Sequence, residues 1–213
     1  MSKNSIKQLR TYIFLDSFQP QLASYTAATA GGYLPIPGEA SLWIEIAPGM
    51  AINRITDIAQ KNTNVKPGVQ VVERAFGVLE VHASEQDEVL AAGDQILQFL
   101  NLSENDRIKP KIISSEVITG IDPYQCMIIN RSRKGSLLIP GQALYILEVH
   151  PSVYVVHAAN EAEKASPVSL IDIRPIGAFG RLYLGGTESA INEAVRAVNS
   201  SLESINGIPN PGK

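Results

Sequence analysis

The sequence Gly32-Tyr-Leu-Pro-Ile-Pro-Gly-Glu-Ala40 returns later in the chain as Gly135-Ser-Leu-Leu-Ile-Pro-Gly-Gln-Ala143. Each identical residue in the second stretch lies 103 positions after its match. The same offset continues without a gap through the matches Glu45 with Glu148, Pro48 with Pro151, Ala59 with Ala162, Lys61 with Lys164, Ala75-Phe76-Gly77 with Ala178-Phe179-Gly180, and Glu85 with Glu188. Solenoid repeats have periods of about 20–50 residues. We therefore interpret the chain as two copies of a whole domain, expected over residues 1–104 and 105–213.

The composition is that of a folded protein. The chain has 213 residues, 45% of them hydrophobic and 18% charged, which suits two domains of about 100 residues each. The net charge of −3 argues against a nucleic-acid-binding protein, which usually carries a basic face. No apolar run approaches the roughly 20 residues of a membrane-spanning helix, and the first residues lack the apolar stretch of a signal peptide. We expect a soluble, cytoplasmic protein.

Each copy mixes strands with helices. Alternating or continuous apolar residues predict strands, and apolar residues spaced three and four apart predict helices. Strands are expected at 9–16, 41–47 and 144–150, and strand–turn–strand units at 70–83 and 169–185. Helices are expected at 16–32, 122–135, 50–62, 153–165, 85–100 and 188–205, with Asp16 and Asp122 as candidate N-caps. The pattern indicates an α+β fold with antiparallel sheets, a polar linker at 103–110 and a flexible tail from Gly207.

One longer pattern occurs once in each copy. It reads Ile44-Glu45 … Asp57-Ile-Ala-Gln-Lys61-Asn-Thr-Asn-Val65 and then Leu147-Glu148 … Asn160-Glu-Ala-Glu-Lys164-Ala-Ser-Pro-Val168. The glutamate precedes the lysine by the same interval in both copies. This pattern resembles the bacterial microcompartment shell domain, in which a strand ending in glutamate precedes a lysine-bearing helix and a valine-containing strand.

The order of the elements refines this resemblance. In single-domain shell proteins the glutamate strand lies near the chain start, whereas here a strand and a helical segment precede it in each copy. The chain thus resembles the circularly permuted, tandem-domain shell proteins of carboxysomes, and the lack of an N-terminal extension favours the β-carboxysome type. The resemblance implies ferredoxin-like domains and a homotrimer that imitates a hexamer and tiles the shell with other carboxysome shell proteins. Whether two trimers stack is left open.

The turn before each Phe-Gly pair is the candidate pore. The first copy has Glu73 and Arg74 there, and the second has the turn Ile176-Gly177-Ala178-Phe179-Gly180. From the residues, Glu73 and Arg74 read as a solvated surface turn. The resemblance instead implies a gate in which three copies of each charge meet on the trimer axis. An open pore would admit small phosphorylated metabolites such as ribulose bisphosphate and phosphoglycerate.

Lys61 and Lys164 also have two readings. Each ends a predicted helix, where a lysine interacts favourably with the helix dipole. The resemblance implies that both lie at the outer edge of the trimer and contact a neighbouring trimer in the shell.

Other candidate sites are weak. His82, His150 and His157 lie in different elements without ligands at metal spacing, so we expect no metal site and no cofactor. Cys126 is expected to be a small buried residue. No nucleophile–base pair supports an enzyme. The alternative to a shell protein is a small-molecule-binding regulatory module, because duplicated α+β domains also occur as sensors.

Overall fold

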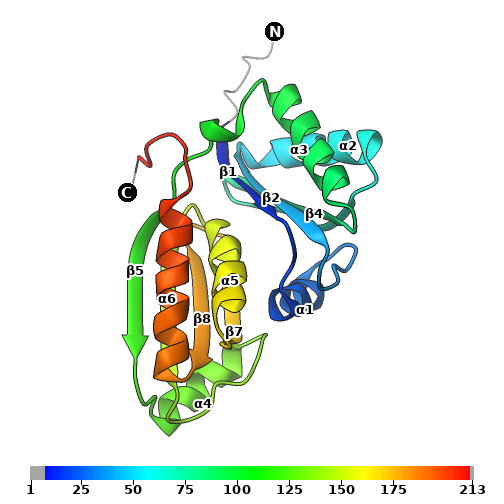
Figure 1. Cartoon of the computed structure of the whole chain (residues 1–213). Coiled ribbons are helices and arrows are strands. Elements are labelled where there is room, and N and C mark those ends of the chain that lie inside the picture. Colours follow the sequence, from blue (N-terminus) through cyan, green and yellow to red (C-terminus); the bar gives the residue numbers. More distant parts are fainter. Residues whose placement is uncertain (1–7, 212–213) are drawn as a thin grey trace.

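The computed structural model describes residues 8–211, which form two α+β domains, each with one four-stranded antiparallel sheet (Figure 1). The elements of the first domain are β1 (Gln8–Leu15), α1 (Pro20–Thr29), β2 (Ala40–Ala47), α2 (Ile52–Asn62), β3 (Lys66–Glu73), β4 (Phe76–Ala83) and α3 (Gln86–Leu100). Those of the second are β5 (Lys111–Ile118), α4 (Pro123–Ser132), β6 (Ala143–His150), α5 (Tyr154–Ala165), β7 (Ser169–Arg174), β8 (Gly180–Gly186) and α6 (Glu188–Glu203).

The two domains repeat each other in topology. The strand orders are β1-β2-β4-β3 and β5-β6-β8-β7. The register shift in β1 between Leu9 and Thr11 recurs in β5 between Ile112 and Ser114, again 103 positions later. The predicted α+β class and the duplication are therefore confirmed at the level of single residues.

The two faces of the first sheet are buried in different ways. One face packs its apolar side chains against α2 and α3, with Leu42, Ile44, Leu79 and Val81 in that cluster. The other face belongs to a cluster that extends into the second domain and includes Trp43, Val69 and Val78 together with Tyr154 and Ile173. The second domain thus completes the core of the first.

Helix α1 is held by the second domain. Its N-cap residue Gln19 makes no side-chain cap, and the N–H groups of Gln21 and Leu22 donate instead to the carboxylate of Glu163 on α5. This arrangement satisfies donors that a helix N-terminus leaves free. The sequence placed the cap at Asp16, which is wrong because Asp16 pairs with Lys164 and the helix begins at Pro20. In the second copy the predicted cap is confirmed, since Asp122 accepts from the N–H of Tyr124.

The linker between the two domains is hydrogen-bonded to the C-terminal segment. Ile108 is buried and bridges to Ile208, whose N–H donates to the Arg107 carbonyl. Asn210 donates to the carbonyl oxygens of Lys109 and His150. The tail that the sequence predicted to be flexible is therefore fixed as far as Asn210, by backbone hydrogen bonds at Ile208 and by the side-chain amide of Asn210.

Candidate functional site

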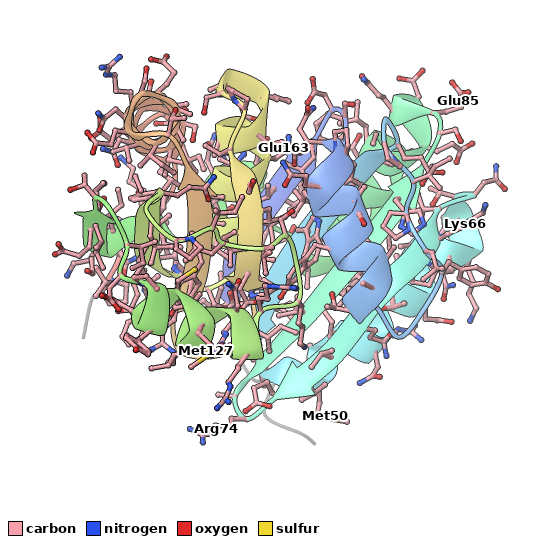
Figure 2. The ribbon with its side chains drawn as sticks, turned by 90° about the horizontal axis from the view of Figure 1, so that it is seen from below. Met50, Lys66, Arg74, Glu85, Met127 and Glu163 are labelled. Atoms are coloured by element: carbon pink, nitrogen blue, oxygen red, sulfur yellow. The ribbon has the colours of Figure 1, made fainter. Side chains whose placement is uncertain are left out.

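The first candidate pore turn is a tight hairpin between β3 and β4. Glu73 pairs with Phe76, so Arg74 and Ala75 form a two-residue turn. Arg74 has φ 52° and a side chain that is 92% exposed, and it points away from the body of the chain (Figure 2). Its Nε lies 3.6 Å from Glu73 Oε1. An exposed ion pair of this kind contributes about 0–1 kcal/mol, so the two charges are free to adopt other partners.

The corresponding turn of the second domain is wider. The last pair of the β7–β8 ladder is Arg174 with Arg181, and Pro175 stands where the first domain has Val72. Proline has no N–H to donate, which explains why the ladder stops earlier. Gly177 takes φ 129°, a value that favours glycine. The sequence placed Gly180 in this turn, but Gly180 begins β8.

Gly77 and Gly180 serve close backbone approach. A Cβ on Gly77 would lie 2.3 Å from the Gly49 carbonyl oxygen, and one on Gly180 would lie 2.0 Å from that of Ser152. The absence of a side chain at each glycine lets the β3–β4 turn pack against the segment before α2 and the β7–β8 turn against the segment before α5. In the first domain the Gly49 N–H also donates to the Ala75 carbonyl.

The two candidate edge lysines have different surroundings. Lys61 is exposed and pairs with Asp57 one helical turn earlier, at 2.8 Å. Lys164 links the two domains, because its Nζ lies 2.7 Å from Asp16 of the first domain and 3.1 Å from Glu161 of its own helix. Burial would lower the pKa of Lys164, but its hydrogen bonds to Asp16 and Glu161 raise it, and the bond to Lys164 lowers the pKa of Asp16. An edge contact by Lys164 would have to coexist with these two pairs.

A buried polar network joins the domains, and no sequence motif indicated it. Arg10 donates to Glu45 Oε1 at 2.6 Å, and Glu45 Oε2 accepts from the Ser152 hydroxyl and the Val153 N–H. Arg10 also donates to His150 Nε2 at 3.0 Å, so the neutral ring of His150 carries its hydrogen on Nδ1, facing Asn210 Oδ1. A comparison of the two copies does point to Arg10 as special to the first domain, because the second copy has the apolar Ile113 at the equivalent position.

The first domain also buries a second acid that the second domain lacks. Glu80 accepts from the Ser41 hydroxyl at 2.7 Å and from the Gly68 N–H at 3.1 Å, and it lies against His82 Nδ1. Burial raises the pKa of Glu80, and His82 opposes this effect. In the second copy Tyr183 and Gly185 occupy the positions of Glu80 and His82.

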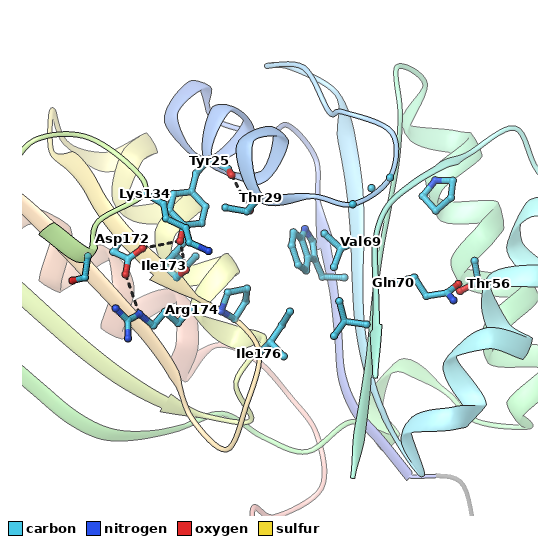
Figure 3. A pocket seen from close by; sticks show the side chains of 18 of the residues that line it. Tyr25, Thr29, Thr56, Val69, Gln70, Lys134, Asp172, Ile173, Arg174 and Ile176 are labelled. Atoms are coloured by element: carbon cyan, nitrogen blue, oxygen red, sulfur yellow. Dashed lines mark hydrogen bonds and ion pairs between the residues drawn. The ribbon is translucent and has the colours of Figure 1, made fainter. Parts of the chain in front are cut away.

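A cavity of about 710 Å³ lies between β3 of the first domain and β7 of the second (Figure 3). Tyr25, from α1, donates to Asp172 Oδ1 and to the Ile173 carbonyl, and Arg174 Nε lies 3.0 Å from Asp172 Oδ2. Trp43 also lines this cavity; its buried indole N–H has no hydrogen-bond partner within residues 8–211. No sequence motif indicated the residues of this cavity.

The remaining candidates are readily placed. Cys126 is buried, as predicted, and donates to the Leu138 carbonyl. Across residues 8–211, His, Cys, Asp and Glu side chains form no group of three that could hold a metal ion. The helices in this part of the chain are too short or too polar to cross a membrane.

Comparison with known sequences gives consistent relatives. Residues 9–106 match the family described as the CsoS1D N-terminal domain. The chain is 51% identical over 205 residues to the carboxysome shell protein CcmP of Synechococcus elongatus, with 96% of each chain covered. It is 50% identical over 199 residues to the carboxysome shell protein CsoS1D of Hydrogenovibrio crunogenus, covering 93% of this chain and 97% of the relative.

Two solved structures have nearly the same fold. A fused permuted hexameric shell protein of the RMM microcompartment superposes with a TM-score of 0.92 at 43% identity, covering 94% of this chain and 99% of that one. A double-ringed trimeric shell protein of the same microcompartment gives 0.93 at 37% identity, covering 96% and 100%. The permuted tandem-domain architecture expected from the order of elements is therefore confirmed.

Proposed function

The chain belongs to the carboxysome shell proteins of the tandem-domain type, and from that premise we propose that three copies close into a pseudohexameric ring that tiles the shell of a β-carboxysome. We assign one shell domain to residues 1–104 and the other to 105–213. The role is structural, without catalysis, and the ring is surrounded by other shell proteins.

The observation that carries this proposal is a difference in burial: surfaces that are equivalent in the two domains are buried in one domain and exposed in the other. Tyr25 on α1 is buried against the second domain, whereas its equivalent Ile128 on α4 is exposed. Met50, Tyr124 and Met127 are likewise exposed and apolar. If the second domain meets the first domain of the next chain as the two domains meet within the chain, these surfaces cover each other. Repetition of one such contact generates a closed ring when the rotation closes.

The central pore follows from the same arrangement. Arg74 and Met50 lie on the same side of the chain in Figure 2, and the Ala75 carbonyl is bonded to Gly49, next to Met50. A ring contact through Met50 therefore brings the charged hairpin toward its symmetry copies. Three Glu73 and three Arg74 can then pair between subunits and close the pore, while Ile176, Gly177 and Ala178 add no charge.

The gate is proposed to be bistable. Exposed ion pairs of about 0–1 kcal/mol each place the paired and unpaired states within a few kcal/mol, so both states stay accessible. In the open state, in which these side chains no longer pair across the axis, the ring of Arg74 side chains at the pore rim would favour anions, as charged rings do in channels. Ribulose bisphosphate and phosphoglycerate are the metabolites that a carboxysome must exchange, and we propose that they pass here.

The outer contacts are proposed to include Lys61 and Lys164. Figure 2 shows Glu163, the neighbour of Lys164, on the side of the chain opposite Arg74. If Arg74 faces the ring axis, the C-terminal end of α5 faces outward, and the duplication leads us to expect the same of α2. Lys61, with only Asp57 as its ion-pair partner among the described residues, is the better placed of the two to contact a neighbouring ring.

The cavity beside Trp43 favours a second candidate function, that of a small-molecule-binding regulatory module. Its volume lies within the range of ligand pockets, and the unpartnered indole N–H offers a hydrogen bond. A sensor would bind a metabolite in solution and would form no layers.

Native mass spectrometry followed by negative-stain imaging separates these candidates. A three-chain mass, or a multiple of it, with hexagonal particles and a central hole is expected for the shell protein. A mass of one or two chains without hexagonal particles would contradict the ring and favour the sensor.

A further inference from the structure

A buried arginine and a histidine lie between the two candidate pore turns of one chain. The guanidinium carbon of Arg10 stacks over the Phe76 ring, 3.7 Å from its centroid, and Phe76 closes the charged hairpin. The His150 ring meets the Phe179 ring edge-on, with 6.1 Å between the centroids, and Phe179 ends the second turn. The hydrogen bond of 3.0 Å between Arg10 and His150 therefore joins the supports of both turns.

Glu45 extends this contact to the backbone beside the second turn. Its Oε1 accepts from Arg10 at 2.6 Å, and its Oε2 accepts from the Ser152 hydroxyl and the Val153 N–H. The Ser152 carbonyl in turn packs against Gly180, where β8 begins. A displacement of Arg10 would therefore be transmitted to both turns, through the ring on which it stacks and through its carboxylate partner.

The pair of Arg10 and His150 occurs once in each chain, although the phenylalanines occur in both copies. The residues that lie 103 positions from Arg10 and His150 are Ile113 and Ala47, neither of which can carry a charge. A junction between the second domain of one chain and the first domain of the next would therefore lack this pair. A ring of three chains would hold three such pairs, one at each junction inside a chain.

The neutral form of His150 is the one that fits this arrangement. Its Nε2 accepts from Arg10, and its Nδ1–H faces Asn210 Oδ1. A protonated ring has no acceptor nitrogen, so it would lose the bond from Arg10 and place a second positive charge beside the first. His150 is only half-buried, so water can deliver the proton.

The other charged groups around His150 do not compensate for that charge. Lys111 lies opposite His150 in the β5–β6 ladder and is itself a cation, and Glu45 is already engaged by Arg10. Burial, Arg10 and Lys111 accordingly lower the pKa of His150, and the hydrogen bond to Asn210 opposes this effect. Protonation would therefore separate His150 from Arg10.

We propose that His150 is a proton-sensitive positioning residue for the pore, and that its protonation releases Arg10 and favours the open state. This inference rests on the gate of the proposed function and adds a signal that shifts it. The closed state needs each hairpin held where Glu73 and Arg74 reach their partners across the axis, whereas the open state has no such requirement. Because the two states are close in free energy, a small loss of support at Phe76 changes their ratio.

The direction of the response to pH follows from this difference between the states. In the closed state His150 is bonded to Arg10 and binds a proton poorly, and in the open state it is released and binds one more readily. The ratio of open to closed rings should therefore rise as the pH falls from the ordinary imidazole pKa of about 6.5 through the lowered pKa of His150. A difference of one pKa unit between the states changes their ratio about tenfold for each proton.

The test is cryo-electron microscopy of the full chain at about pH 8 and about pH 5.5, on either side of the ordinary imidazole pKa. The ratio of open to closed rings should be about tenfold or more higher at the lower pH. His150→Gln keeps an acceptor for Arg10 without titrating, so its ratio should be the same at both pH values. This variant retains Glu73, so any effect of acid on the gate charges themselves would remain in it.

His157→Gln is the matched control. His157 is a second histidine of the same domain, on α5, and burial lowers its pKa as well. It stacks against neither phenylalanine of the pore turns. This control should respond to pH as the original protein does.

A second variant keeps the proposal testable if His150→Gln fails to fold. Phe76→Leu removes the ring on which Arg10 stacks and should reduce the response to pH while leaving His150 in place. A ratio of open to closed rings that is independent of pH in the original protein would overturn the proposal. A response in His150→Gln as large as in the original protein would also overturn it. Rings with a single gate state at both pH values, or an absence of rings, would instead contradict the proposed function.

Discussion

Val153 and Met50 occupy equivalent positions in the two domains, yet Val153 is fully buried and Met50 is 70% exposed. The N–H of Val153 donates to Glu45 of the first domain. The equivalent acid in the second domain, Glu148, pairs with Arg181 of its own sheet. The position that is covered within the chain is therefore open where a neighbouring chain would lie.

Changing Met50 and Ile128 to Asp should abolish the trimer. Both side chains would be buried against the next chain, and an unpaired charge in such an interface is costly. Native mass spectrometry should show single chains, while circular dichroism should remain that of the folded protein. Leu90→Glu is the control and should leave the trimer intact, because Leu90 is an exposed leucine on α3 whose equivalent in the second domain is already Glu193. Persistence of trimers in the Met50/Ile128 variant would mean that the ring uses other surfaces.

Changing Glu73 to Gln and Arg74 to Gly should remove the closed state and keep the trimer. The variant loses up to a few kcal/mol of pairing per ring, and glycine accepts the positive φ of Arg74. Cryo-electron microscopy should show open pores in nearly all rings, against a mixture in the original protein. The exchanged pair Glu73→Arg with Arg74→Glu is the control and should retain closed pores. An unchanged distribution in the uncharged variant would remove these residues from the gate.

Lys61→Asp should prevent ordered layers without affecting trimers, as judged by electron microscopy of assembled sheets. Lys164→Asp should have the same effect and also destabilise the chain by about 1 kcal/mol, because a third carboxylate then faces Asp16 and Glu161. Layers that form normally in Lys61→Asp would exclude this residue from the shell edge.

Arg10→Ile should destabilise the chain by about 3–5 kcal/mol, the usual cost of removing one partner from a buried ion pair. The substitution copies Ile113 of the second domain and leaves Glu45 without its cation. Arg181→Val, which copies Val78, removes a more exposed partner of Glu148 and should cost about 0–1 kcal/mol. Denaturant unfolding at a fixed chain concentration measures both values, and equal costs would contradict the buried network as described.

Acid should weaken the domain junction through His150. Burial and the nearby Arg10 lower the pKa of His150, with Lys111 adding to the effect and the hydrogen bond to Asn210 opposing it. The unfolded chain then binds this proton more readily than the folded chain. Stability is complete above the ordinary imidazole pKa of about 6.5 and is lost as the pH falls from there through the lowered pKa.

The variant His150→Gln should show a flatter dependence of the denaturation midpoint on pH. Burial also lowers the pKa of His157, which gives a dependence of the same sign that remains in the variant. If the denaturation midpoints of the original protein and the variant depend on pH identically, His150 does not contribute to the pH dependence of stability.

The sequence predicted the elements of the fold well and the contacts between domains poorly. A constant offset of 103 identifies equivalent residues and so predicts that the strands recur. It carries no information on Glu163 capping α1, because that contact joins residues from different copies. The local sequence predicts Asp16 as a helix N-cap, but its carboxylate pairs with Lys164 of the other domain instead. Gly180 looked like a turn residue, and its role is to let the Ser152 backbone approach.

Because both domains belong to one chain, half of the domain contacts in the proposed ring are intramolecular, and the hydrogen bonds between residues 107–109 and 206–210 fix the connection between the two domains. Six separate domains would each lose translational and rotational freedom on closing a ring, whereas three linked pairs lose it half as often. The junctions inside each chain form at an effective concentration that dilution does not change. A small number of chains could therefore complete a ring even where single-domain shell proteins are far more abundant.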